Sequence, residues 1–430
     1  MHLQYDIMLG AKTILTALAN YQLQAPYLYL SQFNTFCMRR SAFVYPFILL
    51  FFIFFATNTF AQPAATKPLR IAVLAPLYID SVFDDTSFKG GTMLPKYMLP
   101  GLEFYNGVMM AVDSLQQENT PVEVWVYDTR KANQTPDDLQ LDIATHNVSL
   151  IIASLTTAAE QQSYGAFAFA KNIPFISATY PNDAGIATNP YFVIINPTLK
   201  THVEGIYKFV QRNYIGSKVY YVTRKGAMET KIKGYFEGMV AKTAALKYTQ
   251  LTMPDNFTAD SLRTRIDSSR DAVFICGSLN DNFGAAMVHA LSSITFNGEA
   301  TAAGMPTWDG AKTLEGDECK NVNIIYSTPY NYDRTGQPLT ALCNEYKSKY
   351  NAQPGSMVFK GFEAMYHFTR LLVKLNDSLL YNISDTAFKI CNDYNFQPVH
   401  LTDASYAPDY LENKKLYFVK MLNGEIKSVN

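Results

Sequence analysis

The chain has 430 residues, a formal net charge of −1 at neutral pH and 17% charged residues. A surface that binds nucleic acid needs clustered basic residues, so this near-neutral balance argues against such a partner. The length allows two domains of ordinary size after the N-terminal region.

The N-terminal region has the pattern of a signal peptide. A basic pair at 39–40 precedes an almost continuous apolar run over 43–56. Signal peptidase is expected to cleave after Ala61, which makes residues 38–61 a signal peptide and residues 1–37 an overcalled start or a non-native extension. The alternative is an uncleaved membrane anchor with a cytoplasmic tail, although the apolar run is short for a membrane span.

The expected mature protein begins at Gln62 and lies in the periplasm. Gln62 stands where a lipoprotein would carry cysteine, so no lipid anchor and no membrane association are expected. The cysteines of the mature chain form no C-x-x-C pair, which argues against a metal or redox motif. An oxidising compartment permits disulfides, and the spacing leaves open how these residues would pair: Cys276, Cys319, Cys343 and Cys391.

After Gln62, strand-like and helix-like segments alternate, which is typical of a parallel α/β sheet. Apolar runs predict buried strands over 69–74, 122–127, 150–153, 173–178, 191–195, 218–222, 271–276, 299–303 and 323–326. Helices are predicted over 104–117, 157–171, 202–213, 231–246, 260–268, 282–292, 339–350 and 361–375, and a closing hairpin over 416–429. The connection over 76–101 is long and contains Tyr78 and Phe88. Because a long aromatic loop is more often functional than disordered, we expect a flap that orders when ligand binds.

Polar side chains follow two neighbouring predicted strands. Thr157 and Glu160 have the spacing of a capping box, so a helix is expected to begin there. Free amides and the helix dipole make this edge of a parallel sheet a common place for small anionic ligands. The sequence therefore predicts a ligand site at the strand tips, although Thr157 could serve only as a helix cap. The candidate residues are Ser154, Thr156, Thr157, Ser177, Thr179 and Tyr180.

Motifs of common enzymes are missing from the sequence. No two histidines are spaced as on a zinc-binding helix, and there is no G-x-S-x-G, G-x-x-x-x-G-K or post-strand G-x-G-x-x-G. We therefore expect neither catalysis nor a metal or nucleotide cofactor.

The order of the segments resembles that of type I periplasmic solute-binding proteins, the leucine/isoleucine/valine-binding group of the receptor ligand-binding superfamily. The matching segments are IAVLAPLY (71–78), FYNGVMMAVDSL (104–115), VWVYDT (124–129), LIIASLTTAAE (150–160), IPFISATYPND (173–183), KVYYVTRKG (218–226) and YKSKYNAQPGSMVFKGFEAMYHFTRL (346–371). The resemblance extends over 69–430 and implies two Rossmann-like lobes with parallel sheets flanked by helices, joined by a three-crossing hinge.

The resemblance also implies how the chain divides. Lobe 1 is expected to contain 69–197 plus 328–395, and lobe 2 to contain 198–327 plus 396–430. The crossings are expected near Asn196-Pro197, at 307–310 or the loop after it, and at 327–333.

In that family the tips of lobe 1 hold the ammonium and carboxylate of the ligand, which implies these roles for the six polar residues above. Tyr78 matches an aromatic of the first loop, and Asn280 and Trp308 are the nearest matches in lobe 2. Leu279 stands where the family has tyrosine and Asp309 is displaced from the usual glutamate, which disfavours a plain branched-chain amino acid. Trp308 could equally be packed in its lobe. Arg224 could pair with a ligand carboxylate or be solvated, and Asp128 is expected to be a cap or hinge residue.

The function that the resemblance implies is binding. The protein is expected to be a monomer that captures a small polar, amino-acid-like solute in an interlobe cleft, with an ABC permease as a partner for import. The alternative is an envelope ligand-binding or sensing module without a transporter, which uses the same cleft for a cell-wall fragment or a protein partner.

Overall fold

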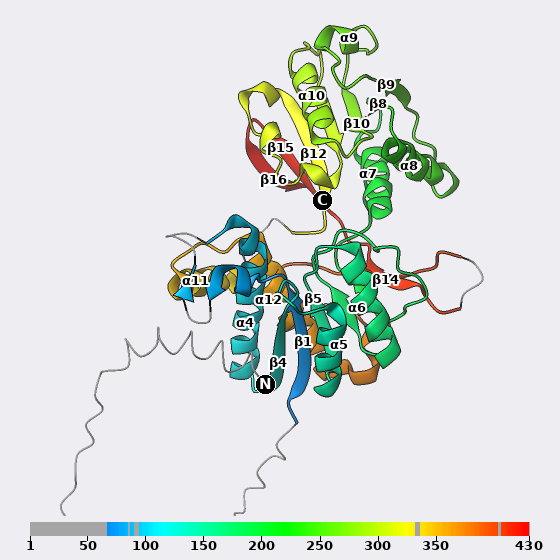
Figure 1. Ribbon diagram of the computed structural model, residues 1–430. Helices are drawn as coiled ribbons and strands as arrows, with labels where there is room; N and C mark the ends of the chain where they lie inside the picture. The colour runs from blue at the N-terminus through cyan, green and yellow to red at the C-terminus, as the bar shows by residue number, and fades with distance from the viewer. Residues whose placement is uncertain (1–66, 85–86, 90–93, 332–335, 403–405, 430) are drawn as a thin grey trace, which may run out of the picture. The chain divides into compact units, whose positions relative to one another are not determined.

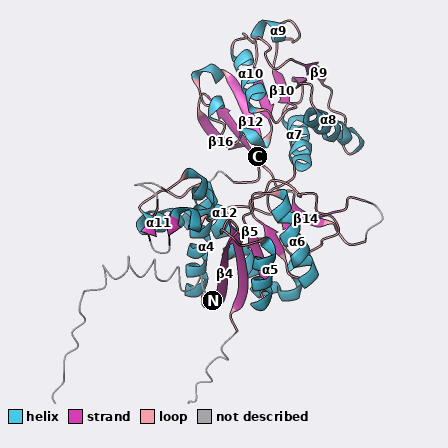
Figure 2. Cartoon of the chain, viewed as in Figure 1, coloured by secondary structure: helices cyan, strands magenta, loops and turns pink. Residues whose placement is uncertain are grey.

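The computed structural model describes residues 67–84, 87–89, 94–331, 336–402 and 406–429. They form two mixed, mostly parallel seven-stranded sheets flanked by helices (Figures 1 and 2). We call each sheet with its helices a lobe. The expected signal peptide and the preceding extension lie outside the described residues. Within those residues, no helix combines the length and apolar character needed to cross a membrane.

The first sheet has the strand order β13-β14-β7-β6-β5-β1-β4. Its strands are β1 (Leu69–Ala75), β4 (Val122–Asp128), β5 (Leu150–Ala153), β6 (Phe175–Ser177), β7 (Phe192–Ile194), β13 (Phe396–Val399) and β14 (Tyr410–Asn413). Its helices are α4 (Leu99–Gln117), α5 (Pro136–Thr145), α6 (Ala158–Lys171), α11 (Gln337–Tyr350) and α12 (Ser356–Leu375). Both neighbours of β1 run parallel to it, so the carboxyl ends of β4, β1 and β5 meet at one edge.

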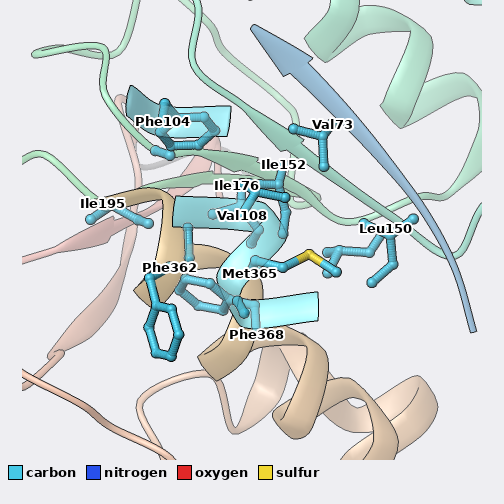
Figure 3. Close-up of a cluster of buried hydrophobic side chains, with 14 of the residues drawn as sticks. Val73, Phe104, Val108, Leu150, Ile152, Ile176, Ile195, Phe362, Met365 and Phe368 are labelled. Carbon is cyan, nitrogen blue, oxygen red and sulfur yellow. The ribbon is translucent and has the colours of Figure 1, made fainter. Parts of the chain in front are cut away.

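Side chains of the first sheet alternate between two cores. Ile71 and Val73 of β1 pack with α4 and α12, whereas Ala72 and Leu74 pack on the opposite face with α5 and α6. Figure 3 shows the first of these cores, in which Val108 of α4 and Phe368 of α12 lie beside the sheet. Burial on both faces explains why these strands have unbroken apolar sequences.

The second sheet has the order β16-β15-β12-β11-β10-β8-β9. Its strands are β8 (Lys218–Thr223), β9 (Thr249–Thr252), β10 (Ala272–Cys276), β11 (Ala300–Gly304), β12 (Val322–Thr328), β15 (Tyr417–Leu422) and β16 (Glu425–Val429). Its helices are α7 (Leu199–Asn213), α8 (Ala227–Glu237), α9 (Ala259–Arg263) and α10 (Asp281–Ser292). The predicted terminal hairpin is confirmed, because β15 and β16 pair antiparallel across Asn423 and Gly424, whose φ angles of 51° and 81° suit a tight hairpin turn.

The connection after β1 contains regular structure. Its described residues include α3 (Ile79–Val82), paired strands β2 (Phe83–Asp84) and β3 (Ser87–Phe88), and a short 3₁₀ turn, η1 (Lys96–Met98). The rings of Phe83 and Phe88 lie 5.7 Å apart and pack across the β2–β3 pair. An aromatic contact thus joins the two strands of this segment, and its closure over a site stays a prediction.

The C-terminal segment divides between the sheets. β14 pairs with β7 and β13 pairs with β14, whereas β15 pairs with β12. The expectation that all of 396–430 belongs to lobe 2 is therefore wrong for residues 396–413. Their sequences, FQPV and YLEN, lack the apolar runs that mark the other strands of this sheet.

The chain passes between the sheets after β7, after β12 and after β14. The first two crossings match the expected positions near Asn196-Pro197 and at 327–333. The expected crossing at 307–310 is wrong, because that segment links β11 and β12, which are neighbours in one sheet. The third crossing lies at 414–416, between β14 and β15.

Within the described part of the chain, no disulfide joins any two of the cysteines at 276, 319, 343 and 391. Cys276 and Cys319 are buried in the core of the second lobe, and Cys343 and Cys391 pack against the core of the first lobe.

Candidate functional site

The carboxyl edge of the first sheet carries the candidate residues of lobe 1. The loops that leave β1, β4, β5 and β6 supply Tyr78, Arg130, Thr156 and Thr179, respectively. The order of the sheet reverses beside β1, because β4 lies on one side of it and β5 on the other. Ligands of open α/β sheets bind at such reversal points, outside the carboxyl ends of the strands.

Asp128 fixes the first of these loops. Its buried carboxylate accepts hydrogen bonds from the backbone amides of Leu77, Tyr78 and Ile79 at 2.8, 3.1 and 2.9 Å. Asp128 therefore caps α3, which is one of the two roles expected for it. The cap holds Tyr78 in a left-handed conformation with φ of 57°, which costs a non-glycine residue about 1–3 kcal/mol. The Tyr78 ring packs edge-on against Tyr97, with ring centres 5.0 Å apart.

Arg130 is a residue of this edge that the sequence did not single out. Its Nη1 and Nη2 atoms lie 2.5 and 3.0 Å from the two carboxylate oxygens of Glu160, in the first turn of α6. Nη2 also donates to the Thr156 hydroxyl at 2.5 Å. Burial alone would raise the pKa of Glu160, but hydrogen bonds from Arg130 and Thr157 hold that pKa below its usual value. Glu160 is therefore ionised at neutral pH, and the hydrogen bond to it raises the pKa of Arg130.

The capping box that begins α6 is confirmed. The Thr157 hydroxyl accepts from the Glu160 amide at 3.3 Å and donates to Glu160 Oε2 at 2.7 Å, and that carboxylate accepts from the Thr157 amide at 3.1 Å. A hydroxyl has one hydrogen to donate, and here Glu160 receives it. This geometry favours the helix-cap alternative for Thr157.

Ser154 and Thr179 lie together at the same edge. Their hydroxyl oxygens are 3.1 Å apart, and the Thr179 carbonyl accepts from Asn196 Nδ2 at 2.6 Å. Tyr180 is half-buried against the core on the α6 side. Ser177 shares a strand face with Phe175, which packs under α6, and Ser177 is fully buried with no hydrogen-bond partner among the described residues. Its hydroxyl therefore faces the protein interior rather than the exposed edge.

Of the candidate residues of the second lobe, Asn280 is exposed, Arg224 is half-buried and Trp308 is buried. Arg224 Nη1 lies 3.1 Å from Asp255 Oδ2, and its Nε lies 3.6 Å from Glu229 Oε1. Asn280 is the N-cap of α10 and accepts from the Phe283 amide at 2.9 Å. A hollow of about 440 Å³ lies at the same edge, lined by Lys225, Thr252, Met253, Pro254 and Asp255.

Trp308 is packed in the core of the second lobe. Its side chain is 2% exposed, and a Cβ atom added to Gly304 would lie 2.0 Å from the indole Cδ2. Gly284 approaches the same ring from α10, because a Cβ added there would lie 2.6 Å from Nε1. The structure thus supports the packing alternative, and Trp308 is not free to stack on a ligand.

Metal coordination is not suggested by the described part of the chain. No group of three or more His, Cys, Asp or Glu side chains within it could hold a metal ion. The chemistry available at the first edge consists of hydroxyl groups, the first-turn amides of α6 and one ion pair. Such groups can bind a polar molecule.

No protein-family model matches the sequence, and no curated protein matches it significantly. Solved structures do match its fold. One was assigned as a branched-chain amino acid ABC transporter from Rhodospirillum rubrum (12% identity, TM-score 0.59, 84% of this chain and 100% of that chain). A second, from Silicibacter pomeroyi, has the same assignment (14%, 0.55, 84% and 96%).

A third match is an ABC transporter substrate-binding protein from Desulfitobacterium hafniense in complex with leucine (11% identity, TM-score 0.53, 84% of this chain and 100% of that chain). Likeness at these identities establishes the fold. The chain has the type I periplasmic binding protein fold, that of non-enzymatic solute-binding proteins.

Proposed function

We propose that this protein is a periplasmic, monomeric binding protein that captures one small polar solute between its lobes for ABC-type import. The observation that supports the proposal is the group of polar side chains at the reversal point of the first sheet. Thr156 is exposed there, and the half-buried Thr179 pairs with the buried Ser154, beside the N-terminus of α6. This is the edge at which open α/β sheets bind ligands.

The second lobe supplies a comparable edge. Its sheet order reverses beside β8, which pairs with β9 on one side and β10 on the other. Arg224 follows β8, and Asn280 follows β10. We propose that these two residues contact the ligand from lobe 2, while Tyr78 and the three hydroxyls contact it from lobe 1. Ser177 and Trp308 are left out because they are buried on the core side, and Thr157 is left out because its one hydroxyl hydrogen goes to Glu160.

Only the similarity in fold to transporter proteins supports delivery to a permease. Capture of a ligand is supported by the chemistry of the edges themselves. An envelope sensor without a transporter would use the same residues. A permease that co-purifies with the ligand-loaded protein would support import over sensing.

The proposal predicts that ligand closes the lobes. Three backbone crossings link two self-contained cores, so a ligand that touches both lobes shifts the population toward a closed form. Small-angle scattering is measured on the mature protein, before and after adding fractions of a periplasmic small-molecule extract. We expect one fraction to reduce the radius of gyration. Tight binding without any change in scattering would show that a single lobe carries the site and would contradict capture between lobes.

A further inference from the structure

The ion pair at the edge of the first lobe determines what charge its subsite accepts. We infer that this subsite takes an uncharged polar group, such as a hydroxyl or a carboxamide, and rejects a free carboxylate. The inference rests on the proposed ligand site at this edge and assigns a chemical class to the part of the ligand bound there. Glu160 is the residue that sets this specificity, and Arg130 is the cation that Glu160 neutralises.

The positive end of α6 is already occupied by a carboxylate of the chain itself. Glu160 accepts hydrogen bonds from both terminal nitrogens of Arg130 and from the amide and hydroxyl of Thr157. An acidic side chain in the first turn offsets the partial positive charge of a helix N-terminus. A ligand carboxylate would therefore meet a neutralised helix end with a fixed negative charge beside it.

The guanidinium of Arg130 also donates its hydrogen bonds to groups of the protein itself. Besides Glu160, its guanidinium donates to the Thr129 carbonyl at 3.1 Å and to the Thr156 hydroxyl. Glu160 is 8% exposed and its side chain belongs to the capping box. For a ligand carboxylate to replace Glu160 on Arg130, the cap of α6 would have to break and a buried charge would lose its partner. Both changes oppose the exchange.

The polar atoms that remain suit a neutral group. The Thr156 hydroxyl accepts from Arg130 and keeps its own hydrogen to donate. Ser154 and Thr179 share one hydrogen bond, which leaves one hydroxyl hydrogen and unused lone pairs between them. A hydroxyl or a carboxamide can both donate to and accept from such a set, whereas a carboxylate can only accept.

Acetamide and acetate test this assignment because they are nearly the same shape and differ in charge. Each is titrated into the isotope-labelled mature protein, and the backbone amide resonances of residues 154–160 and 179 are followed by NMR. For the wild-type protein we expect saturable shifts with acetamide and none with acetate. For Glu160→Gln, which can keep a capping side chain while freeing the charge of Arg130, we expect acetate to bind at least about tenfold more tightly than to the wild type.

The double variant Glu160→Gln, Arg130→Met is the matched control, in which the new acetate binding should disappear. If Glu160→Gln does not fold, Arg130→Met is titrated alone. It leaves the charge of Glu160 unpaired at this edge, so acetate should still give no shifts, and saturable acetate shifts would contradict the inference. Wild-type protein that binds acetate as well as acetamide would overturn the inference, as would wild-type protein that responds to neither. The titration does not depend on lobe closure, so it tests the inference separately from the proposed function. If the wild-type protein bound acetate and a ligand still closed the lobes, the subsite would take a carboxylate, and the proposed capture of a solute would stand.

Discussion

Replacing Glu412 with alanine is expected to lower the free energy of unfolding by about 3–5 kcal/mol, the loss typical of breaking a buried charged network. Glu412 lies at the end of β14 and is 1% exposed. Its Oε1 accepts from the Thr198 amide and hydroxyl at 2.7 and 2.9 Å and from the Thr201 hydroxyl at 2.6 Å. Its Oε2 pairs with Lys414. Alanine would leave the Thr198 amide and the Thr198 and Thr201 hydroxyls without this acceptor, in the region where the first and third crossings meet. Lys414 would keep only its bond to the Thr201 hydroxyl.

Equilibrium urea denaturation measures this loss. The matched control is Glu123→Ala, which removes a carboxylate paired with Arg70 in an ion pair whose side chains are 42% and 44% exposed. Exposed pairs contribute little, so the control should change the free energy of unfolding by less than about 1 kcal/mol. Equal effects of the two substitutions would show that the contacts of Glu412 do not stabilise the crossings.

Replacing Gly361 with alanine is expected to destabilise the first lobe by about 1–3 kcal/mol, the usual result of overpacking a core. Gly361 is in α12, and an added Cβ would lie 2.1 Å from the Phe104 carbonyl oxygen of α4. The reverse approach occurs at Gly107 of α4, where a Cβ would lie 2.0 Å from the Val358 carbonyl oxygen. The two helices thus touch backbone to backbone. An added methyl group would push them apart and open the core shown in Figure 3.

Thermal and urea unfolding of Gly361→Ala should be compared with those of Gly234→Ala. Gly234 lies in α8, and an added Cβ there would meet nothing within 4 Å. Because alanine is favoured over glycine in a helix, Gly234→Ala should stabilise the protein by up to about 1 kcal/mol. Opposite signs for the two substitutions are the expected result. If Gly361→Ala also stabilised the protein, the result would contradict the backbone-to-backbone contact between α4 and α12.

The architecture could be predicted because most of its strands and helices are marked by patterns within their own sequences. The run LRIAVLA gives β1, since a strand covered on both faces has apolar residues at every position. The capping box of Thr157 and Glu160 could be recognised because its two partners are three residues apart. The strands β13 and β14 were not predicted, because Glu412 is buried through bonds to Thr198, which is far away in sequence.

The candidate site was harder to predict for the same reason. Arg130 carries no local signal, and its role depends on Glu160, 30 residues further along the chain. Trp308 was a candidate ligand contact at a strand tip, with packing in its lobe as the equal alternative. Gly284 and Gly304 leave the space in which the indole is buried. Residue type and spacing identified the edge of the sheet. Three-dimensional contacts were needed to distinguish the hydroxyls that keep a hydrogen to donate from the Thr157 hydroxyl, which donates to Glu160.

Native mass spectrometry of the protein as purified from its native cells tests most directly the claim that the first edge holds a captured solute. The comparison is with the double variant Ser154→Val, Thr179→Val, which removes the paired hydroxyls at that edge. We predict that the wild-type protein carries one small molecule per chain, released on denaturation, and that the variant carries none while keeping the mass of the intact chain. A bound mass retained equally by both proteins, or absent from both, would contradict capture of a solute at this edge.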